Sequence, residues 1–228
     1  MIRTFSTTLL RISVASLLLA LLGACGVLEA SREPQPAFYS LYGARPAAHP
    51  ASTPPVPWSI TAPTLIVNPP HAAAGFDSQR IIYTREPHQL QYFAHSEWVD
   101  TPARMIAPSI VAALEDTGAF RAVVLTPSAA AGDLRLNVEI LRLQHEFASS
   151  PSRVRFTLRA YMVDNETRQV IAWREFDETV VAGQDNPYGG VVAANAAVKK
   201  VMERLASFYA EAARGWISET GRHARAGN

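Results

Sequence analysis

The chain has 228 residues, a formal net charge of +1, 48% hydrophobic residues and 18% charged residues. This balance is typical of a folded globular protein and excludes a largely disordered chain. It also lacks the basic excess of nucleic-acid-binding proteins, so no nucleic-acid partner is expected. The single cysteine, Cys25, excludes an internal disulfide and any paired-cysteine metal or redox site.

Residues 1–24 have the pattern of a secretory signal peptide. Arg3 and Arg11 precede an uncharged, mostly apolar run over residues 12–22, which is too short to span a bilayer. The run ends in Leu-Gly-Ala-Cys25, which resembles the bacterial lipobox. Cleavage before Cys25 and acylation of its thiol are therefore predicted, and several acyl chains give stable attachment. Gly26, rather than Asp, resembles the signal for the outer membrane, so we expect the periplasmic face of that membrane.

Residues 25–60 are predicted to form the lipidated cysteine and a Pro/Ala-rich tether. Residues 46–76 contain no charged side chain, but their many prolines exclude a membrane-spanning helix and favour an extended, semi-rigid chain. The folded domain is expected over residues 61–215, followed by a polar tail over residues 216–228.

The domain alternates short apolar runs with turn signals. Strands are predicted over residues 64–68, 80–83, 89–93 and 120–125, and a helix begins at Thr101-Pro102 and ends before Gly118. Pro108 is expected to kink this helix. Strict alternation over 134–140 and 153–162 predicts two long strands with one buried face, and a further strand covers 170–180. The predicted core residues on the first two are Leu134, Leu136, Val138, Ile140, Val154, Phe156, Leu158 and Met162.

A last helix is predicted from residue 187 to residue 214. Its apolar residues recur every three or four positions, from Val191 to Ala212, which is typical of a helix that packs on a core. A coiled-coil seam that joins copies of the chain into a homo-oligomer is the alternative. The expected fold is an α+β domain in the order β-β-β-α-β-β-β-β-α, with a mostly antiparallel sheet and both helices on one face.

No grouping of side chains indicates catalysis. The histidines lack zinc-site spacing, and no nucleophile, nucleotide or phosphate motif occurs. We therefore expect no catalytic residue, no cofactor, no metal and no enzyme activity.

The exposed face of the long strands carries Arg135, Arg153, Arg155 and Arg159. One hypothesis is that these arginines, with Arg174, bind an acidic protein surface or lipid phosphates. The alternative is a solvated face with cross-strand pairs to Glu139, Glu175 and Glu178.

Several segments together resemble the ABC-type transport auxiliary lipoprotein family. They are residues 38–41, 80–83, 90–94, 98–102 and 114–120, and the C-terminal strands and helix also fit. The resemblance implies a non-catalytic outer-membrane partner of an MCE-type (mammalian cell entry) lipid transport system. The implied partners are an MCE-domain periplasmic protein, its inner-membrane permease complex and, as an open question, phospholipid.

Two other functions remain open. One is an outer-membrane assembly factor or pilotin-like chaperone. The other is a peptidoglycan- or glycan-binding lipoprotein, for which Tyr161 and Trp173 are the candidate exposed aromatics, although Trp173 is expected to pack at an edge.

Overall fold

The computed structural model describes residues 35–41 and 62–226, with side-chain surroundings described up to residue 218. Cys25 and most of the predicted tether lie outside the described residues. All the described strands and helices belong to one unit, residues 36–228.

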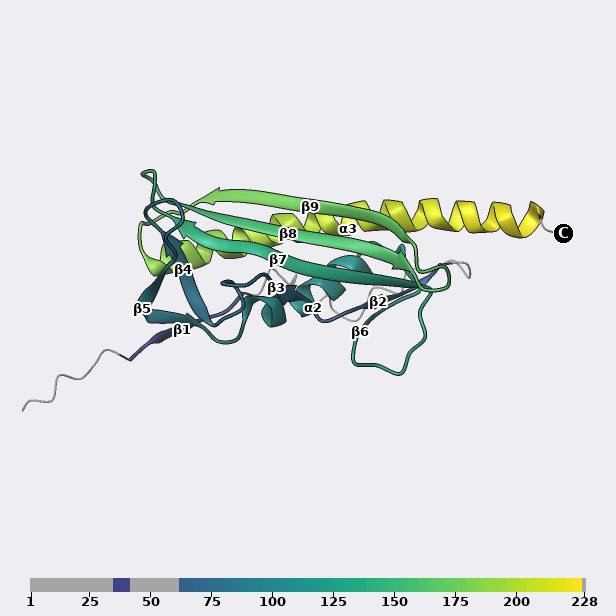
Figure 1. Ribbon diagram of the computed structural model, residues 1–228, viewed down its shortest axis with the longest axis horizontal. Helices are drawn as coiled ribbons and strands as arrows, with labels where there is room; N and C mark the ends of the chain where they lie inside the picture. The colour runs from purple at the N-terminus through teal and green to yellow at the C-terminus, as the bar shows by residue number, and fades with distance from the viewer. Residues whose placement is uncertain (1–34, 42–61, 227–228) are drawn as a thin grey trace, which may run out of the picture. The chain divides into compact units, whose positions relative to one another are not determined.

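Three long antiparallel strands form the larger part of the sheet (Figure 1). They are β7 (Leu134–Glu146), β8 (Arg153–Asp164) and β9 (Val170–Val181). Each follows its neighbour through a short turn, as the alternating sequence pattern predicted. β7 and β8 extend beyond their predicted ends, because a β-bulge between Ile140 and Arg142 restores the buried face further along β7.

The other edge of β7 is occupied by three short strands in succession. They are β2 (Thr64–Val67), β3 (His71–Ala72) and β4 (Arg80–Thr84), and all three run parallel to β7. The sheet is therefore mixed, and the expectation of a mostly antiparallel sheet was wrong for this half. Pro69-Pro70 ends β2, because proline cannot donate a ladder hydrogen bond, and β3 was not predicted.

Three further strands complete the sheet. β5 (Gln91–Trp98) pairs antiparallel with β4, β1 (Ala37–Tyr39) pairs parallel with β5, and β6 (Ala122–Leu125) pairs parallel with β2. β1 was not predicted, because residues 37–41 fall within the range given to the tether. Leu41, which follows β1, is 1% exposed and belongs to the core. The chain after the predicted anchor therefore reaches the sheet at residue 37.

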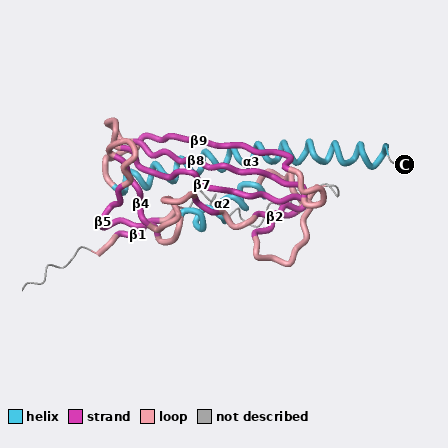
Figure 2. The backbone as a smooth tube through the Cα atoms, viewed as in Figure 1, coloured by secondary structure: helices cyan, strands magenta, loops and turns pink. Residues whose placement is uncertain are grey.

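Two helices pack against the sheet (Figure 2). α2 (Pro102–Glu115) begins with Thr101 at its N-cap, although the threonine side chain makes no capping hydrogen bond. Gly118, just after the helix, has a φ of +62°, a conformation that glycine adopts without strain. α3 (Pro187–Ala226) continues past the predicted end at residue 214, and its last turns run beyond the sheet (Figure 1).

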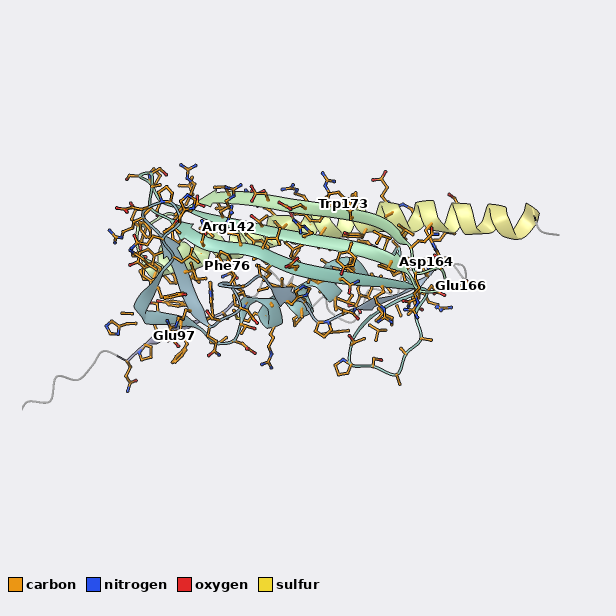
Figure 3. The ribbon with its side chains drawn as sticks, viewed as in Figure 1. Phe76, Glu97, Arg142, Asp164, Glu166 and Trp173 are labelled. Carbon is orange, nitrogen blue, oxygen red and sulfur yellow. The ribbon has the colours of Figure 1, made fainter. Side chains whose placement is uncertain are left out.

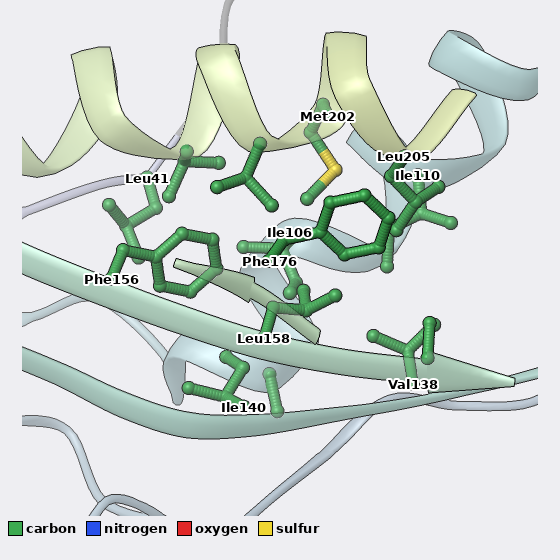
Figure 4. Packing of buried hydrophobic residues seen from close by; sticks show 14 of the residues in the cluster. Leu41, Ile106, Ile110, Val138, Ile140, Phe156, Leu158, Phe176, Met202 and Leu205 are labelled. Carbon is green, nitrogen blue, oxygen red and sulfur yellow. The ribbon is translucent and has the colours of Figure 1, made fainter. Parts of the chain in front are cut away.

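The core lies between the sheet and both helices (Figure 4). All eight predicted core residues of β7 and β8 are at most 2% exposed, which confirms the predicted buried face of both strands. Phe156 and Leu158 face Met202 and Leu205 of α3 in Figure 4. On the last buried turns of α3, Tyr209 and Ala213 are fully buried, whereas Phe208 and Ala212, which continue the apolar spacing from Val191, are partly buried.

Candidate functional site

The outer sheet face is the surface of β7, β8 and β9 that points away from the core. Cross-strand rows run across it, and each row takes one residue from each strand. From the β7–β8 turn onward, the rows contain Glu146–Arg153–Val181, Gln144–Arg155–Thr179, Arg142–Thr157–Asp177, Glu139–Arg159–Glu175, Asn137–Tyr161–Trp173 and Arg135–Val163–Val170.

Two of the four predicted arginines form ion pairs within this face. Arg155 donates from Nε and Nη2 to both carboxylate oxygens of Asp177, at 2.8–3.2 Å, and Arg159 Nη2 lies 3.1 Å from Glu175 Oε2. The hydrogen bond from Arg155 lowers the pKa of Asp177 below its ordinary value of 3.8. All four carboxylate and guanidinium side chains remain about 40–46% exposed, so they stay accessible while their charges are balanced.

The other two predicted arginines make local contacts. Arg135 donates from Nε to Asn165 Oδ1 at 3.1 Å, and Arg153 Nη2 donates to Ser149 Oγ at 2.8 Å. The structure thus brings the four arginines onto one face, but each contacts a neighbour of its own chain.

Two residues expected with this group lie elsewhere. Glu178 pairs with Lys200 and Arg204 of α3, and the Arg174 guanidinium lies 5.1 Å from the ring centre of Phe208, also on α3. Both side chains therefore lie toward the helix and do not belong to the outer sheet face.

An aromatic pair stands beside the charged rows. Tyr161 and Trp173 face each other across β8 and β9 and are 38% and 66% exposed. Figure 3 labels Trp173 on β9. The expectation that Trp173 packs at an edge was wrong, because its position in β9 points the indole away from the core. Asn137 completes the row and accepts a hydrogen bond from Asn68 Nδ2 at 2.7 Å, so amide groups flank the rings.

A serine, a histidine and an aspartate meet where the β7–β8 turn approaches the start of α3. His145 Nε2 lies 2.7 Å from Ser152 Oγ, and that hydroxyl donates to Asp185 Oδ1 at 2.6 Å. The Ser152 N–H also donates to Asp185 Oδ1 at 2.8 Å. No local sequence pattern indicates this group, since its members come from three separate segments.

This order of contacts differs from that of a hydrolase triad. There the histidine takes the serine proton and the aspartate orients the histidine. Here the serine hydroxyl donates a hydrogen bond to the aspartate, and Ser152 is completely buried. Burial lowers the pKa of His145 below 6.5, while the Asp185 charge opposes that shift. The network therefore ties the turn to α3 through a neutral histidine.

Gly190 explains why α3 approaches this histidine closely. A Cβ at residue 190 would overlap His145 Nδ1. His145 Nδ1 is buried and has no hydrogen-bond partner within the described protein. Gly189-Gly190 at the start of α3 makes room for the histidine ring and for the backbone at Gln184.

A groove of about 900 Å³ lies between α2 and α3. Its apolar lining includes Leu41, Met105, Pro108, Val111 and Met202. Charged residues of both signs also line it, namely Arg104, Glu115, Asp116, Lys199 and Glu203. No local sequence pattern predicts the groove, because its two walls are far apart in the chain.

The described part of the chain holds no cluster of three side chains suited to bind a metal ion. Over the same residues, no helix is both long enough and apolar enough to cross a membrane.

The family model of the ABC-type transport auxiliary lipoprotein component matches residues 39–206. The chain belongs to this family. The match covers β2 to β9, α2, the first half of α3 and the outer sheet face. It confirms the resemblance drawn from the sequence and identifies an auxiliary component of a transport system. No curated protein sequence matches the chain.

Solved structures show the same fold. A Xanthomonas campestris protein of the DUF330 family matches with a TM-score of 0.63 and 24% identity, covering 72% of this chain and 92% of that one. An uncharacterized protein matches with a TM-score of 0.58 and 13% identity, covering 77% and 99%. At these identities the likeness concerns the fold.

Proposed function

We propose that the protein is an outer-membrane lipoprotein that docks to the periplasmic conduit of an MCE-type lipid transport system. The family match over residues 39–206 carries the proposal, since it assigns an auxiliary role in transport. The predicted acylation of Cys25 would hold the domain at the membrane, and the domain itself would bind an MCE-domain protein coupled to an inner-membrane permease.

The outer sheet face is the proposed docking surface. Trp, Tyr and Arg are the residue types that contribute most to protein interfaces, and this face presents Tyr161 and Trp173 beside Arg155 and Arg159. The ion pairs with Asp177 and Glu175 hold both guanidinium groups in fixed positions before a partner arrives. A surface of this kind favours specific docking over non-specific attraction, because its charges are already balanced.

A photo-crosslinking amino acid at position 173 tests the proposal in intact cells. We expect capture of an MCE-domain protein from position 173 and from position 159, and none from Glu211, an exposed position on α3. The variant Trp173→Ala should weaken capture from position 159 without lowering stability, because the indole is largely exposed. Deletion of the gene should sensitise cells to detergent, and Trp173→Ala should restore resistance less well than the wild-type gene.

The same experiment separates the two other functions. Capture of a β-barrel assembly component or a secretin, and no MCE-domain protein, would favour the chaperone function. The exposed pair of Tyr161 and Trp173 also suits stacking on a sugar ring. Retention on purified peptidoglycan that is lost in Trp173→Ala would favour the glycan-binding function.

A further inference from the structure

We propose that the β1 edge of the domain rests on the phospholipid surface of the membrane that carries the acyl anchor. The surface concerned, the β1 edge patch, consists of Phe38 and Tyr39 of β1 with Tyr188 and Val192 of α3. The inference rests on the predicted acylation of Cys25. It goes beyond the proposed function, because it assigns a second surface whose partner is lipid.

Several large apolar side chains at this edge are exposed to solvent. Phe38 and Tyr188 are each 60% exposed and Val192 is 52% exposed. The Tyr39 and Tyr188 rings lie with their centres 6.4 Å apart, and Asn195 Nδ2 donates to the Ser40 carbonyl at 3.1 Å. These contacts hold the first turns of α3 beside β1, so Tyr39, Tyr188 and Val192 lie on the helix side of this edge, while Phe38 leaves β1 on the opposite flank.

The position of β1 in the sheet makes this edge accessible. β1 pairs with β5 alone, so its other side is unpaired within the described sheet. Consecutive strand residues point to opposite sides, so Phe38 and Tyr39 place rings on both flanks of the strand. On α3, Tyr188 and Val192 are four residues apart and share one side of the helix.

Chain length places this edge near the membrane. Only eleven residues, 26–36, separate Cys25 from β1. Even fully extended, they reach no more than about 40 Å, because each residue spans at most about 3.6 Å. A tether that ended at residue 60, as the sequence predicted, would have let the domain lie much farther from the membrane. An acylated domain would therefore hold its β1 edge within this distance of the headgroups at all times.

The residues of the patch suit a headgroup region. Tyrosine places an apolar ring in the interface and keeps its hydroxyl in water, and aromatic residues concentrate at this depth of membranes. None of the four side chains is charged, so none must be desolvated as an ion. A second, weaker contact beside the acyl chains would not add much affinity, but it would orient the domain.

Docking in this orientation leaves the outer sheet face free for a partner. Trp173 of β9 is separated from β1 by β8, β7, β4 and β5 in the order of the sheet. It is 66% exposed, close to the value for Phe38 and Tyr188. Trp173 is therefore a matched control: an equally exposed aromatic residue that the proposal keeps away from lipid.

The test uses the acylated full-length protein in vesicles of phosphatidylethanolamine and phosphatidylglycerol. Acylation consumes the thiol of Cys25, so Tyr188→Cys or Trp173→Cys provides a single thiol for a fluorescent label. Mass spectrometry first confirms the acyl chains. Lipids with a nitroxide near the headgroup should then quench the label at residue 188 strongly and the label at residue 173 only weakly.

A second variant checks the patch itself. Phe38→Ser should remove most of the quenching at residue 188, while the protein still floats with the vesicles through its acyl chains. Weak quenching at residue 188, or equal quenching at 173 and 188, would overturn the inference and leave the proposed transport role intact. Self-quenching at residue 188 that persists in detergent would overturn it in favour of a second copy. A mature chain without acyl mass would contradict the anchor, and the inference with it.

Discussion

Arg155 and Phe156 are neighbours in β8 whose side chains leave the strand on opposite faces. Phe156 is completely buried, and truncation of such a ring leaves a cavity, so Phe156→Ala should lower the free energy of unfolding by about 3–5 kcal/mol. Arg155→Ala removes an exposed ion pair with Asp177 and should cost less than about 1 kcal/mol. Urea denaturation of both variants measures the difference. Similar losses in both would contradict the strand register.

The buried His145 predicts a pH dependence of stability. Burial holds its pKa in the folded state below the ordinary value of 6.5, so the unfolded chain binds more protons between the two values. Its contribution to stability is complete above pH 6.5 and is lost as the pH falls through the folded-state pKa. His145→Gln, whose amide can still donate to Ser152, should therefore show a flatter stability profile from pH 6.5 downward. Urea denaturation at several pH values measures this, and a profile as steep as that of the wild-type protein would contradict the prediction.

At the scale of the elements, one hydrogen bond joins α3 to the far end of the sheet. Trp216 Nε1 donates to Asp164 Oδ2 at 2.7 Å, and Asp164 Oδ1 accepts from two N–H groups of the β8–β9 turn. Burial raises the pKa of Asp164, but these hydrogen bonds outweigh burial and hold it below 3.8. The carboxylate is therefore charged at neutral pH. Figure 3 shows Asp164 at this end of the sheet.

Trp216→Phe should weaken the C-terminal half of α3. The change keeps a ring and removes the donor to a charged acceptor, which costs about 1–3 kcal/mol. Hydrogen exchange of the α3 amides after residue 210 should become faster, while exchange in the core of β8 stays unchanged. Unchanged exchange in α3 would mean that the packing of the ring, and not the hydrogen bond, holds the helix in place.

The elements that sequence predicted best are those whose pattern is long and local. β7, β8, β9 and α3 each repeat their apolar spacing over many residues, so their type and buried side follow directly from the pattern. β1 and β3 have only three and two residues, too few to show a period. The parallel pairing of β2, β3 and β4 with β7 joins segments far apart in the chain, which no local pattern reveals.

The candidate sites also contain some features that a local sequence pattern predicts and others that it does not. The four arginines and Tyr161 were placed on one face by strand alternation alone, whereas their partners depend on which strand lies opposite. The group of His145, Ser152 and Asp185 and the groove between the helices exist only after the chain has folded.

At the scale of the whole molecule, the predicted attachment to the membrane depends on one residue, Cys25. Cys25→Ser should leave an unprocessed precursor without an acyl label, because no other thiol can take the diacylglycerol group. Metabolic labelling with a radioactive fatty acid, together with membrane fractionation, measures both effects. A Cys25→Ser chain that is still processed and found in the outer membrane would show that another feature holds the protein there.

The succession of β2, β3 and β4 along one edge of β7 affects the order in which the chain can fold. A chain is made from its N-terminus, yet β2 and β3 find no neighbour on this edge until β7 is available, with Leu134 coming 69 residues after Leu65. Contacts so far apart in sequence form slowly, whereas β7, β8, β9 and α3 pair with nearby segments. A fragment that ends at residue 133 should therefore show no cooperative unfolding transition by circular dichroism. The first half of the chain would wait unfolded for the second, a state that suits delivery through a narrow export channel.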